Sequence, residues 1–370
     1  MKLAIIGAAV GQRTLCIKAR EMGVETIGFA WAKGAVCKDL FDHFYDVSIL
    51  DVNKIVDICK QEKVDGVVTN ASDLTVDTSS YVAENLGCPC TPYSTVKKIK
   101  DKYIVRNLTH DVEGLSQVRN MEYDGSYPDF FPCIVKPVSG AGKEGVSIAF
   151  SKVEFDQAIK YALGESSPKK PILIEEYIEG REISVESISF HGKHYVIQVT
   201  DKDSSGAPHF VELGHHQPAN IDCEMRRKIN EVVPRILDAI DFANGATHIE
   251  MKINAKGCLY LIEVNPRGGG DEISNTLVAL STNVDYVKSM IEVALNIFKA
   301  PEVRNTKFAG IYYLCKQTGE YVDFFKRIDA EPWLLKKDIS SYELNEATGN
   351  RDRNGYFIYC ADKKIVLEGK

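Results

Sequence analysis

The sequence predicts a mixed α/β and α+β protein, in which a parallel-sheet domain precedes a larger, strand-rich unit. Residues 1–95 alternate apolar strands such as "KLAIIGA" with helical stretches such as "QRTLCIKAREMG", a pattern typical of a parallel sheet with helical crossovers. From "FPCIVKP" onward, strand pairs joined by glycine turns replace this alternation. A chain of 370 residues is long enough for two or three domains. We expect domains over 1–95, 96–300 and 301–370.

The composition is that of an ordinary globular protein, with 44% hydrophobic and 26% charged residues. The net charge of −7, without any block of lysine and arginine, disfavours nucleic acid as a partner. No segment approaches the roughly 20 apolar residues of a membrane span, and the apolar start is too short for a signal peptide. The ten cysteines form no C-x-x-C pair, which disfavours structural zinc. We expect a cytoplasmic protein without a membrane partner.

Helices are predicted at three places beyond the first domain. The stretch "KKIKDKYIVRNL" at 97–110 is expected to be one helix that opens the second domain. Ser151 and Glu154 form a capping box before "VEFDQAIKYAL". Asn283 is the expected N-cap of "VDYVKSMIEVALNIF". In the tail, "FAGIYYLC" and "GYFIYCA" are expected to be strands.

The stretch "IVKPVSGAGKEGV" combines a lysine at a strand end with a glycine-rich turn. Lys136 ends the apolar strand, and Gly140, Gly142 and Gly145 follow before the next strand. Backbone N–H groups of such a hairpin can cover phosphates, with the lysine as a point charge beneath them. The P-loop pattern G-x-x-x-x-G-K-[ST] is absent. A simple turn remains the alternative interpretation.

The stretch "ILIEEYIEGREISVES" is a strand that runs into an acidic linker. Glu175, Glu176, Tyr177 and Ile178 end the strand, and Glu182 follows a turn. A linker of this kind can offer backbone donors and acceptors to a flat base, and the later acid can accept hydrogen bonds from ribose hydroxyls. A solvated acidic surface segment is the alternative.

The stretch "THIEMKINAKGCLYLIEVNPRGGG" predicts a hairpin that turns at Asn254–Gly257. By strand alternation, Leu261, Glu263 and Asn265 share one face, while Ile262 and Val264 point into a core. Pairing should end near Arg267, because Pro266 cannot donate to a ladder.

The hairpin's loop length decides how its acids meet. A loop of two or four residues places Glu250 opposite Glu263 or Leu261, with the two acids on one face, whereas a three-residue loop would break that arrangement. Paired carboxylates repel each other unless a cation lies between them. Together with Asn265 they supply the oxygen ligands that Mg²⁺ prefers. An exposed face neutralised by Lys252 is the alternative.

The stretch "HFVELGHHQPAN" contains Glu212, His215 and His216. A histidine here can orient a phosphate or carry a proton near neutral pH. A loop histidine without a role is the alternative.

Taken in order, the lysine–glycine loop, the acidic linker and the paired acids with N-P-R resemble the ATP-grasp superfamily. The domain at 1–95 is similar to the one that biotin carboxylase and amino-acid ligases place before the ATP-binding fold. The resemblance implies a two-subdomain ATP-grasp fold over 96–300, which residues 301–370 complete. It also implies ATP and Mg²⁺ (or Mn²⁺) as cofactors, and a homodimer is common for this fold.

The resemblance implies a role for each matching residue. Lys102 and Lys136 would contact the phosphates of ATP, and the loop from Ser139 to Gly145, including Gly140 and Gly142, would close over them. The remaining implied nucleotide and metal contacts are adenine at Glu175, Glu176, Tyr177 and Ile178, ribose at Glu182, and Mg²⁺ at Glu250, Glu263 and Asn265. Arg267 would stabilise the transferring phosphoryl group. The implied substrate contacts are Glu212, His215, Arg267, Gly268 and Gly269, with His215 also a candidate catalytic residue.

The pattern E-x-G-H-x-x-P from Glu212 to Pro218 is similar to one in bacterial L-amino-acid ligases. It favours a carboxylate–amine ligase, which activates a carboxylate as an acyl phosphate and couples it to an amine, giving an amide or dipeptide. A biotin carboxylase-like enzyme is an alternative, although Gly268–Gly270 and the acids after them depart from its pattern. A nucleotide-binding regulatory protein without turnover is another. The sequence does not identify the carboxylate, the amine or the pathway.

Overall fold

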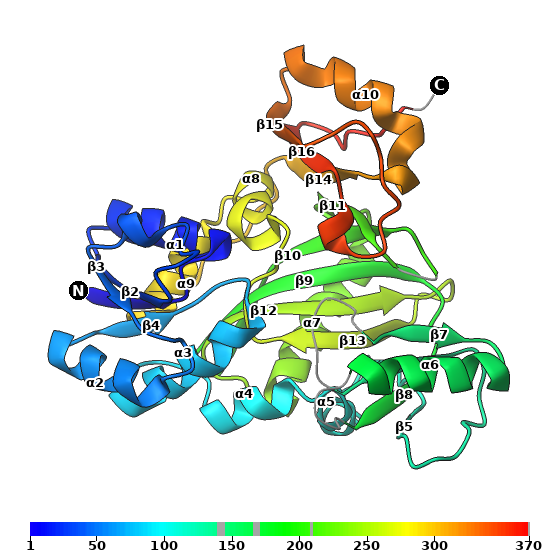
Figure 1. The fold of residues 1–370 in the computed structure, drawn as a ribbon, viewed down its shortest axis with the longest axis horizontal. Coiled ribbons are helices and arrows are strands. Elements are labelled where there is room, and N and C mark those ends of the chain that lie inside the picture. The colour runs from blue at the N-terminus through cyan, green and yellow to red at the C-terminus, as the bar shows by residue number, and fades with distance from the viewer. Residues whose placement is uncertain (139–144, 166–170, 208–209, 369–370) are drawn as a thin grey trace.

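The computed structural model describes residues 1–138, 145–165, 171–207 and 210–368. The strands form three sheets, two of four strands and one of eight. The predicted mixed α/β class is confirmed. Figure 1 shows the N-terminal sheet on one side of the large sheet, the small sheet with β5 and β8 on another, and the C-terminal strands at its far end.

The N-terminal sheet is parallel, with strand order β3-β2-β1-β4. Its elements are β1 (Lys2–Ile6), β2 (Glu25–Ala30), β3 (His43–Asp46), β4 (Gly66–Val68), α1 (Val10–Glu21), α2 (Val52–Glu62) and α3 (Asp73–Leu86). Alternate residues of β1 enter two cores: Leu3 and Ile5 pack with α1, while Ala4 and Ile6 pack with α2 and α3. The distant helix α9 (Tyr286–Ala294) joins the first core, so this layer is completed by residues from beyond 95.

The small sheet is antiparallel, with strand order β5-β8-β6-β7. Its elements are β5 (Asn120–Glu122), β6 (Cys133–Pro137), β7 (Ser147–Ala149), β8 (Ile172–Glu176) and α6 (Lys152–Glu165). Phe155 of α6 is buried against Cys133, Val135 and Ile174. The oxygen of Ser151 accepts the N–H of Glu154 at 3.4 Å, and the Glu154 carboxylate accepts the N–H of Phe150 at 2.6 Å. The predicted capping box is therefore only partly formed, because Glu154 binds the N–H of Phe150 and not that of Ser151.

The large sheet is antiparallel, with strand order β13-β12-β9-β10-β11-β14-β16-β15. Its strands are β9 (Arg181–Phe190), β10 (Lys193–Ser204), β11 (Glu212–Gln217), β12 (Gly245–Ile253), β13 (Leu259–Asn265), β14 (Phe308–Leu314), β15 (Leu334–Ile339) and β16 (Gly355–Ala361). The α-helices between them, besides α9, are α7 (Cys223–Ala239), α8 (Val278–Ser281) and α10 (Val322–Arg327). Strands from after residue 301 thus extend the same sheet that holds β12 and β13.

Two helix predictions need correction. The stretch 97–110 is not one helix but belongs to α4 (Tyr93–Ile99) and α5 (Lys102–Leu108). The chain breaks between them because Asp101 turns to cap α5, accepting the N–H of Ile104 at 3.0 Å. Asn283 does not cap α9; Asp285 does, accepting the N–H of Lys288 at 2.9 Å. Asn283 is instead bonded to the segment around Arg304.

Candidate active site

A cleft of about 360 Å³ lies where the small sheet, the large sheet and the start of α3 meet. Most of the predicted site residues line it, although they come from segments far apart in the sequence. They are Lys102, Lys136, Glu175, Glu176, Tyr177, Ile178, Glu182, Glu212, Glu250, Glu263, Asn265 and Arg267. Ser139, Gly140 and Gly142, which were predicted to belong to the phosphate loop, lie outside the described residues. Gly145 is described and precedes Val146, which lines the cleft.

The hairpin of β12 and β13 places Glu250 directly opposite Glu263, by a route that the sequence did not predict. Its loop has three residues, Ala255–Gly257, because the N–H of Asn254 donates to the carbonyl of Cys258 at 3.1 Å. Such a loop alone would pair Glu250 with Ile262. The register shifts by one residue between Glu250 and Met251, so Ile262 is the extra residue of β13 and the two acids meet.

The same register shift overturns one prediction about the faces of β13. Leu261 does not share a face with Glu263 and Asn265; it packs in the core with Val264. Ile262, predicted to enter the core, lines the cleft instead. A bulge adds one residue to one strand, so the alternation of faces slips at that point.

Arg106 stabilises the bulge at Ile262, and no sequence pattern indicated this role. Its Nη2 donates to the carbonyl of Ile262 at 2.9 Å, and its Nε donates to Glu175 Oε1 at 2.5 Å. Glu175 also forms an ion pair with Lys136. All three side chains are at most 8% exposed. Burial alone would raise the pKa of Glu175. The charges of Arg106 and Lys136 outweigh this effect and lower the pKa to about 2. Arg106 therefore links the bulge to the predicted phosphate lysine.

Lys136 lies in a surplus of positive charge. Burial lowers its pKa, and the nearby Arg106 and Lys102 lower it further, while Glu175 alone opposes them. Lys136 and Arg106 share the one carboxylate of Glu175. A phosphate group bound here would relieve their repulsion, because it would give Lys136 an anionic partner of its own.

The two opposed acids each have a lysine partner. Lys102 Nζ lies 3.0 Å from Glu263 Oε1, and Lys202 Nζ lies 2.7 Å from Glu250 Oε1. Burial raises the pKa of Glu250, but Lys202 and His248 hold it well below its usual range. Glu250 is thus held ionised, the state in which it can bind a metal ion.

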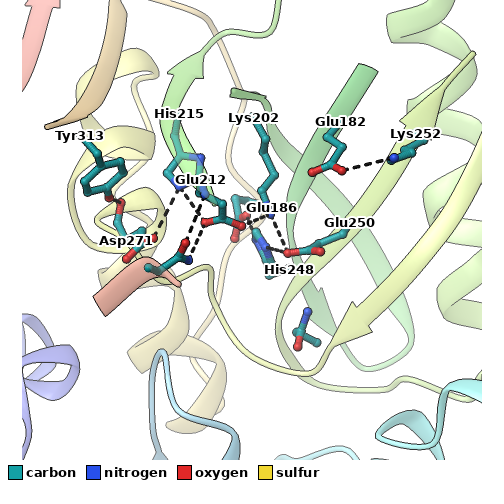
Figure 2. A network of polar contacts seen from close by, with 12 residues as sticks. Glu182, Glu186, Lys202, Glu212, His215, His248, Glu250, Lys252, Asp271 and Tyr313 are labelled. Carbon is teal, nitrogen blue, oxygen red and sulfur yellow. Dashed lines mark hydrogen bonds and ion pairs between the residues drawn. The ribbon is translucent and has the colours of Figure 1, made fainter. Parts of the chain in front are cut away.

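His248 supports Glu250 from the same strand. Its Nδ1 bonds to the fully buried Glu186, and its Nε2 lies 3.3 Å from Glu250 Oε1. Burial lowers the pKa of His248, but Glu186 and Glu250 raise it to about 9, so it is a cation at neutral pH. Figure 2 shows His248 and Lys202 both directed toward Glu250.

Arg267 is held by a residue from the N-terminal layer. Its Nε donates to Asp73 Oδ1 at 2.6 Å, and its Nη2 donates to Asn265 Oδ1 at 3.3 Å. Asp73 is the first residue of α3 and follows a turn in which Ala71 has a φ of +55°. Burial lowers the pKa of Arg267, but Asp73 raises it above its ordinary value. The guanidinium thus faces the cleft in a fixed orientation.

The acidic linker is fixed by Lys252, which lies on the same strand face as Glu250. Lys252 Nζ donates to the carbonyl of Ile178 at 3.1 Å and lies 3.3 Å from Glu182 Oε1. It also lies 5.0 Å from the centre of the Tyr177 ring, a cation–π contact. The linker end of the cleft is therefore braced by β12.

At the other end of the cleft, Glu212 and His215 lie on β11 rather than in a loop. Lys202 Nζ lies 2.8 Å from Glu212 Oε1. Asp271, which follows the three glycines, is bound by Arg353 Nη2 at 3.0 Å to each carboxylate oxygen. His216 points to the opposite side of β11 and packs against Tyr312 and Tyr359. Gly268 and Gly269 are buried, the first against Asn70 and Ser274 and the second against His248 and Glu186, and do not line the cleft.

Sequence reasoning missed six side chains that complete the site: Asp73, Arg106, Glu186, Lys202, His248 and Arg353. His248 had a detectable signal, since strand alternation places it on the face of β12 that carries Glu250, whereas Lys202 and Glu186 lie in strands with several other polar residues and had none. Asp73, Arg106 and Arg353 had none, because their partners are distant in the sequence.

The comparisons with known proteins agree with this geometry. The family described as "ATP-grasp domain" matches residues 129–276. The chain carries an ATP-grasp domain. It is 24% identical over 347 residues to a formate-dependent phosphoribosylglycinamide formyltransferase of Sulfurisphaera tokodaii, covering 89% of this chain and 84% of that protein. It is 25% identical over 248 residues to an alanine–anticapsin ligase of Bacillus amyloliquefaciens, covering 59% of this chain and 52% of that ligase.

Among solved structures, an L-amino acid ligase from Bacillus licheniformis superimposes with a TM-score of 0.80 at 22% identity, covering 98% of this chain and 93% of that one. The predicted ATP-grasp fold is confirmed, and the predicted enzyme class agrees with relatives and neighbours that are named as ligases. No helix within the described ranges is long and apolar enough to cross a bilayer.

Proposed function

We propose that this protein is an ATP-dependent carboxylate–amine ligase that works through an acyl phosphate. One observation carries the proposal: a single cleft brings the cations Lys102, Lys136 and Arg267 together with the opposed acids Glu250 and Glu263. Phosphoryl transfer depends on positioning and on neutralising charge, and this arrangement supplies both.

The residues of the cleft fit a nucleotide and a divalent metal ion. The surplus of positive charge around Lys136 suits phosphates, and the facing carboxylates with Asn265 are oxygen donors suited to Mg²⁺ or Mn²⁺. When bound, ATP would supply the phosphoryl group, and the metal ion would neutralise its charge. The linker backbone at Glu176 and Ile178 would hold adenine.

At the reacting centre, Arg267 would stabilise the charge that develops on the phosphoryl group as the substrate carboxylate attacks. Asp73 would keep its guanidinium in place through the 2.6 Å bond. Lys202, shared between Glu212 and Glu250, would stop those acids from repelling the incoming carboxylate. The contact between adenine and the Glu175 side chain stays a prediction. In this structure the carboxylate is instead paired with Arg106 and Lys136.

The relatives support carboxylate activation followed by amine attack. One is named a ligase of alanine with anticapsin, and another is named for its dependence on formate. A carboxylating enzyme is the second candidate, and its mark would be a requirement for bicarbonate.

The test is ATP-dependent hydroxamate formation with Mg²⁺ and hydroxylamine, across pooled carboxylic acids and amino acids, while ADP is followed in parallel. Hydroxylamine intercepts an acyl phosphate whatever the natural amine is. Hydroxamate from one pool, lost in Arg267→Ala, would support the ligase and identify its first substrate. ADP formation that needs bicarbonate and yields no hydroxamate would favour the carboxylating enzyme instead.

A further inference from the structure

Three potential metal ligands converge at the substrate end of the cleft, next to the predicted Mg²⁺ residues, since Glu212 and Glu250 share Lys202. They are Glu212 and His215 on β11 and Asp271 after the glycines, as Figure 2 shows. His215 Nε2 lies 3.3 Å from Glu212 Oε2 and 3.8 Å from Asp271 Oδ2. One donor atom from each residue lies within 4.8 Å of the others.

His215 is buried, and it meets Glu212 and Asp271 at ion-pair distances without the geometry of a hydrogen bond. Its side chain is 0% exposed, and neither ring nitrogen has a hydrogen-bond partner within the part of the chain that the structure describes. Burying a polar group without a good hydrogen bond is unfavourable, and a bound ion would remove that cost. The ring is held edge-on to Tyr313, with 5.9 Å between ring centres, so its direction toward the two acids is fixed.

The spacing of these atoms distinguishes between the ions that they could bind. Two ligands at about 2.0–2.2 Å from one metal ion lie about 3 Å apart at a right angle and about 4 Å apart on opposite sides. An ammonium ion bound tetrahedrally at about 2.9 Å would instead place its acceptors about 4.7 Å apart. The observed 3.3 and 3.8 Å fall in the range for a metal ion.

The carboxylates of Glu212 and Asp271 are each held by a neighbouring cation, as metal-ligating carboxylates are held by residues of the outer coordination shell. Lys202 binds the Glu212 oxygen that faces away from His215, and Arg353 holds Asp271. Counting Glu250, which shares Lys202, and Glu186 with its cationic partner His248, four carboxylates face three cations, so the local charge still favours another cation. Hydrogen bonds of this kind fix the direction of metal-ligating carboxylates.

We propose that Glu212, His215 and Asp271 form a second divalent-metal site, separate from Glu250, Glu263 and Asn265. An imidazole ligand favours ions such as Zn²⁺, Fe²⁺ or Ni²⁺, and the two carboxylates also suit Mn²⁺, whereas Mg²⁺ prefers oxygen ligands alone. Glu212 and Asp271 both line the cleft, so a substrate amine or carboxylate can reach the ion. Binding of the ion does not require the proposed ligase reaction to be correct.

The test is Mn²⁺ binding by the full chain after treatment with EDTA, without nucleotide or substrate, followed by pulsed electron paramagnetic resonance. The expected result is bound Mn²⁺ with nitrogen coupling from an imidazole. That coupling should disappear in His215→Ala and persist in Glu263→Gln, which alters the predicted Mg²⁺ set. His110→Ala is the matched control, because His110 is a histidine with 70% of its side chain exposed.

Asp271→Asn is a second variant that conserves volume, and circular dichroism verifies its fold. It should weaken the nitrogen-coupled Mn²⁺ at least tenfold. Mn²⁺ bound with oxygen ligands only, or nitrogen coupling that survives in His215→Ala, would overturn the proposal. Since no turnover is measured, failure of the ligase assay would leave this result unaffected.

Discussion

Replacing Arg106 with methionine should destabilise the protein more than any change of an exposed arginine. The side chain is 5% exposed, pairs with Glu175 and binds the carbonyl of Ile262. Its loss leaves Lys136 as the remaining cationic partner of Glu175 and removes the only side-chain donor found to the bulge carbonyl among the described residues. Breaking a buried ion pair from one side costs about 3–5 kcal/mol.

The pKa of Glu175 gives an independent magnitude. Lowering a carboxyl pKa from 4.5 to about 2 corresponds to about 3 kcal/mol of folding free energy. Because the pKa is lower in the folded state, this stability is present above about pH 4.5 and is lost as the pH falls toward 2. Arg106 is the largest charge contribution to it, so the cost of Arg106→Met should shrink in acid.

The assay is urea unfolding followed by circular dichroism at pH 7 and pH 3.5. Arg119→Met is the matched control, since the side chain of Arg119 is 57% exposed and pairs at the surface with Glu176; it should change the free energy of unfolding by less than about 0.5 kcal/mol. A cost below about 1 kcal/mol for Arg106→Met at pH 7, or a cost that grows in acid, would refute the reasoning.

Three further predictions concern the cleft. Arg267→Ala should cut turnover at least about a hundredfold and leave ATP binding nearly unchanged, as measured by kinetics and calorimetry, because its role is confined to the transition state; equal activity would exclude that role. Asp73→Asn should lower kcat more than it raises KM for ATP, because it loosens Arg267 without touching the nucleotide; a change in KM alone would contradict this. Glu263→Gln should raise the Mg²⁺ concentration needed for half-maximal rate about tenfold or more, and an unchanged Mg²⁺ titration would remove Glu263 from the metal site.

The sequence predicted well wherever chemistry is local. Period-two alternation, glycine turns and the N-P-R stop located β12 and β13, because these signals lie within a single hairpin. The facing of Glu250 and Glu263 was predicted too, but from a loop length that the structure does not have. It failed at Leu261 and Ile262, since a bulge depends on the bond from Arg106, more than 150 residues away. It also failed at Asn283, where two candidate caps lie two residues apart and tertiary contacts decide between them.

The bulge at Ile262 is the point where these local and distant effects meet. A three-residue loop alone would leave Glu250 opposite an isoleucine, and the extra residue restores the pairing of the acids. The carbonyl that the bulge leaves unpaired in the ladder is bound by Arg106, whose other bond holds Glu175 beside Lys136. The geometry of the predicted metal ligands is therefore coupled, through one buried arginine, to the lysine predicted to bind phosphate. A mutation at Arg106 should consequently affect metal and nucleotide affinity together, whereas changes at Glu263 or Lys136 alone should separate them.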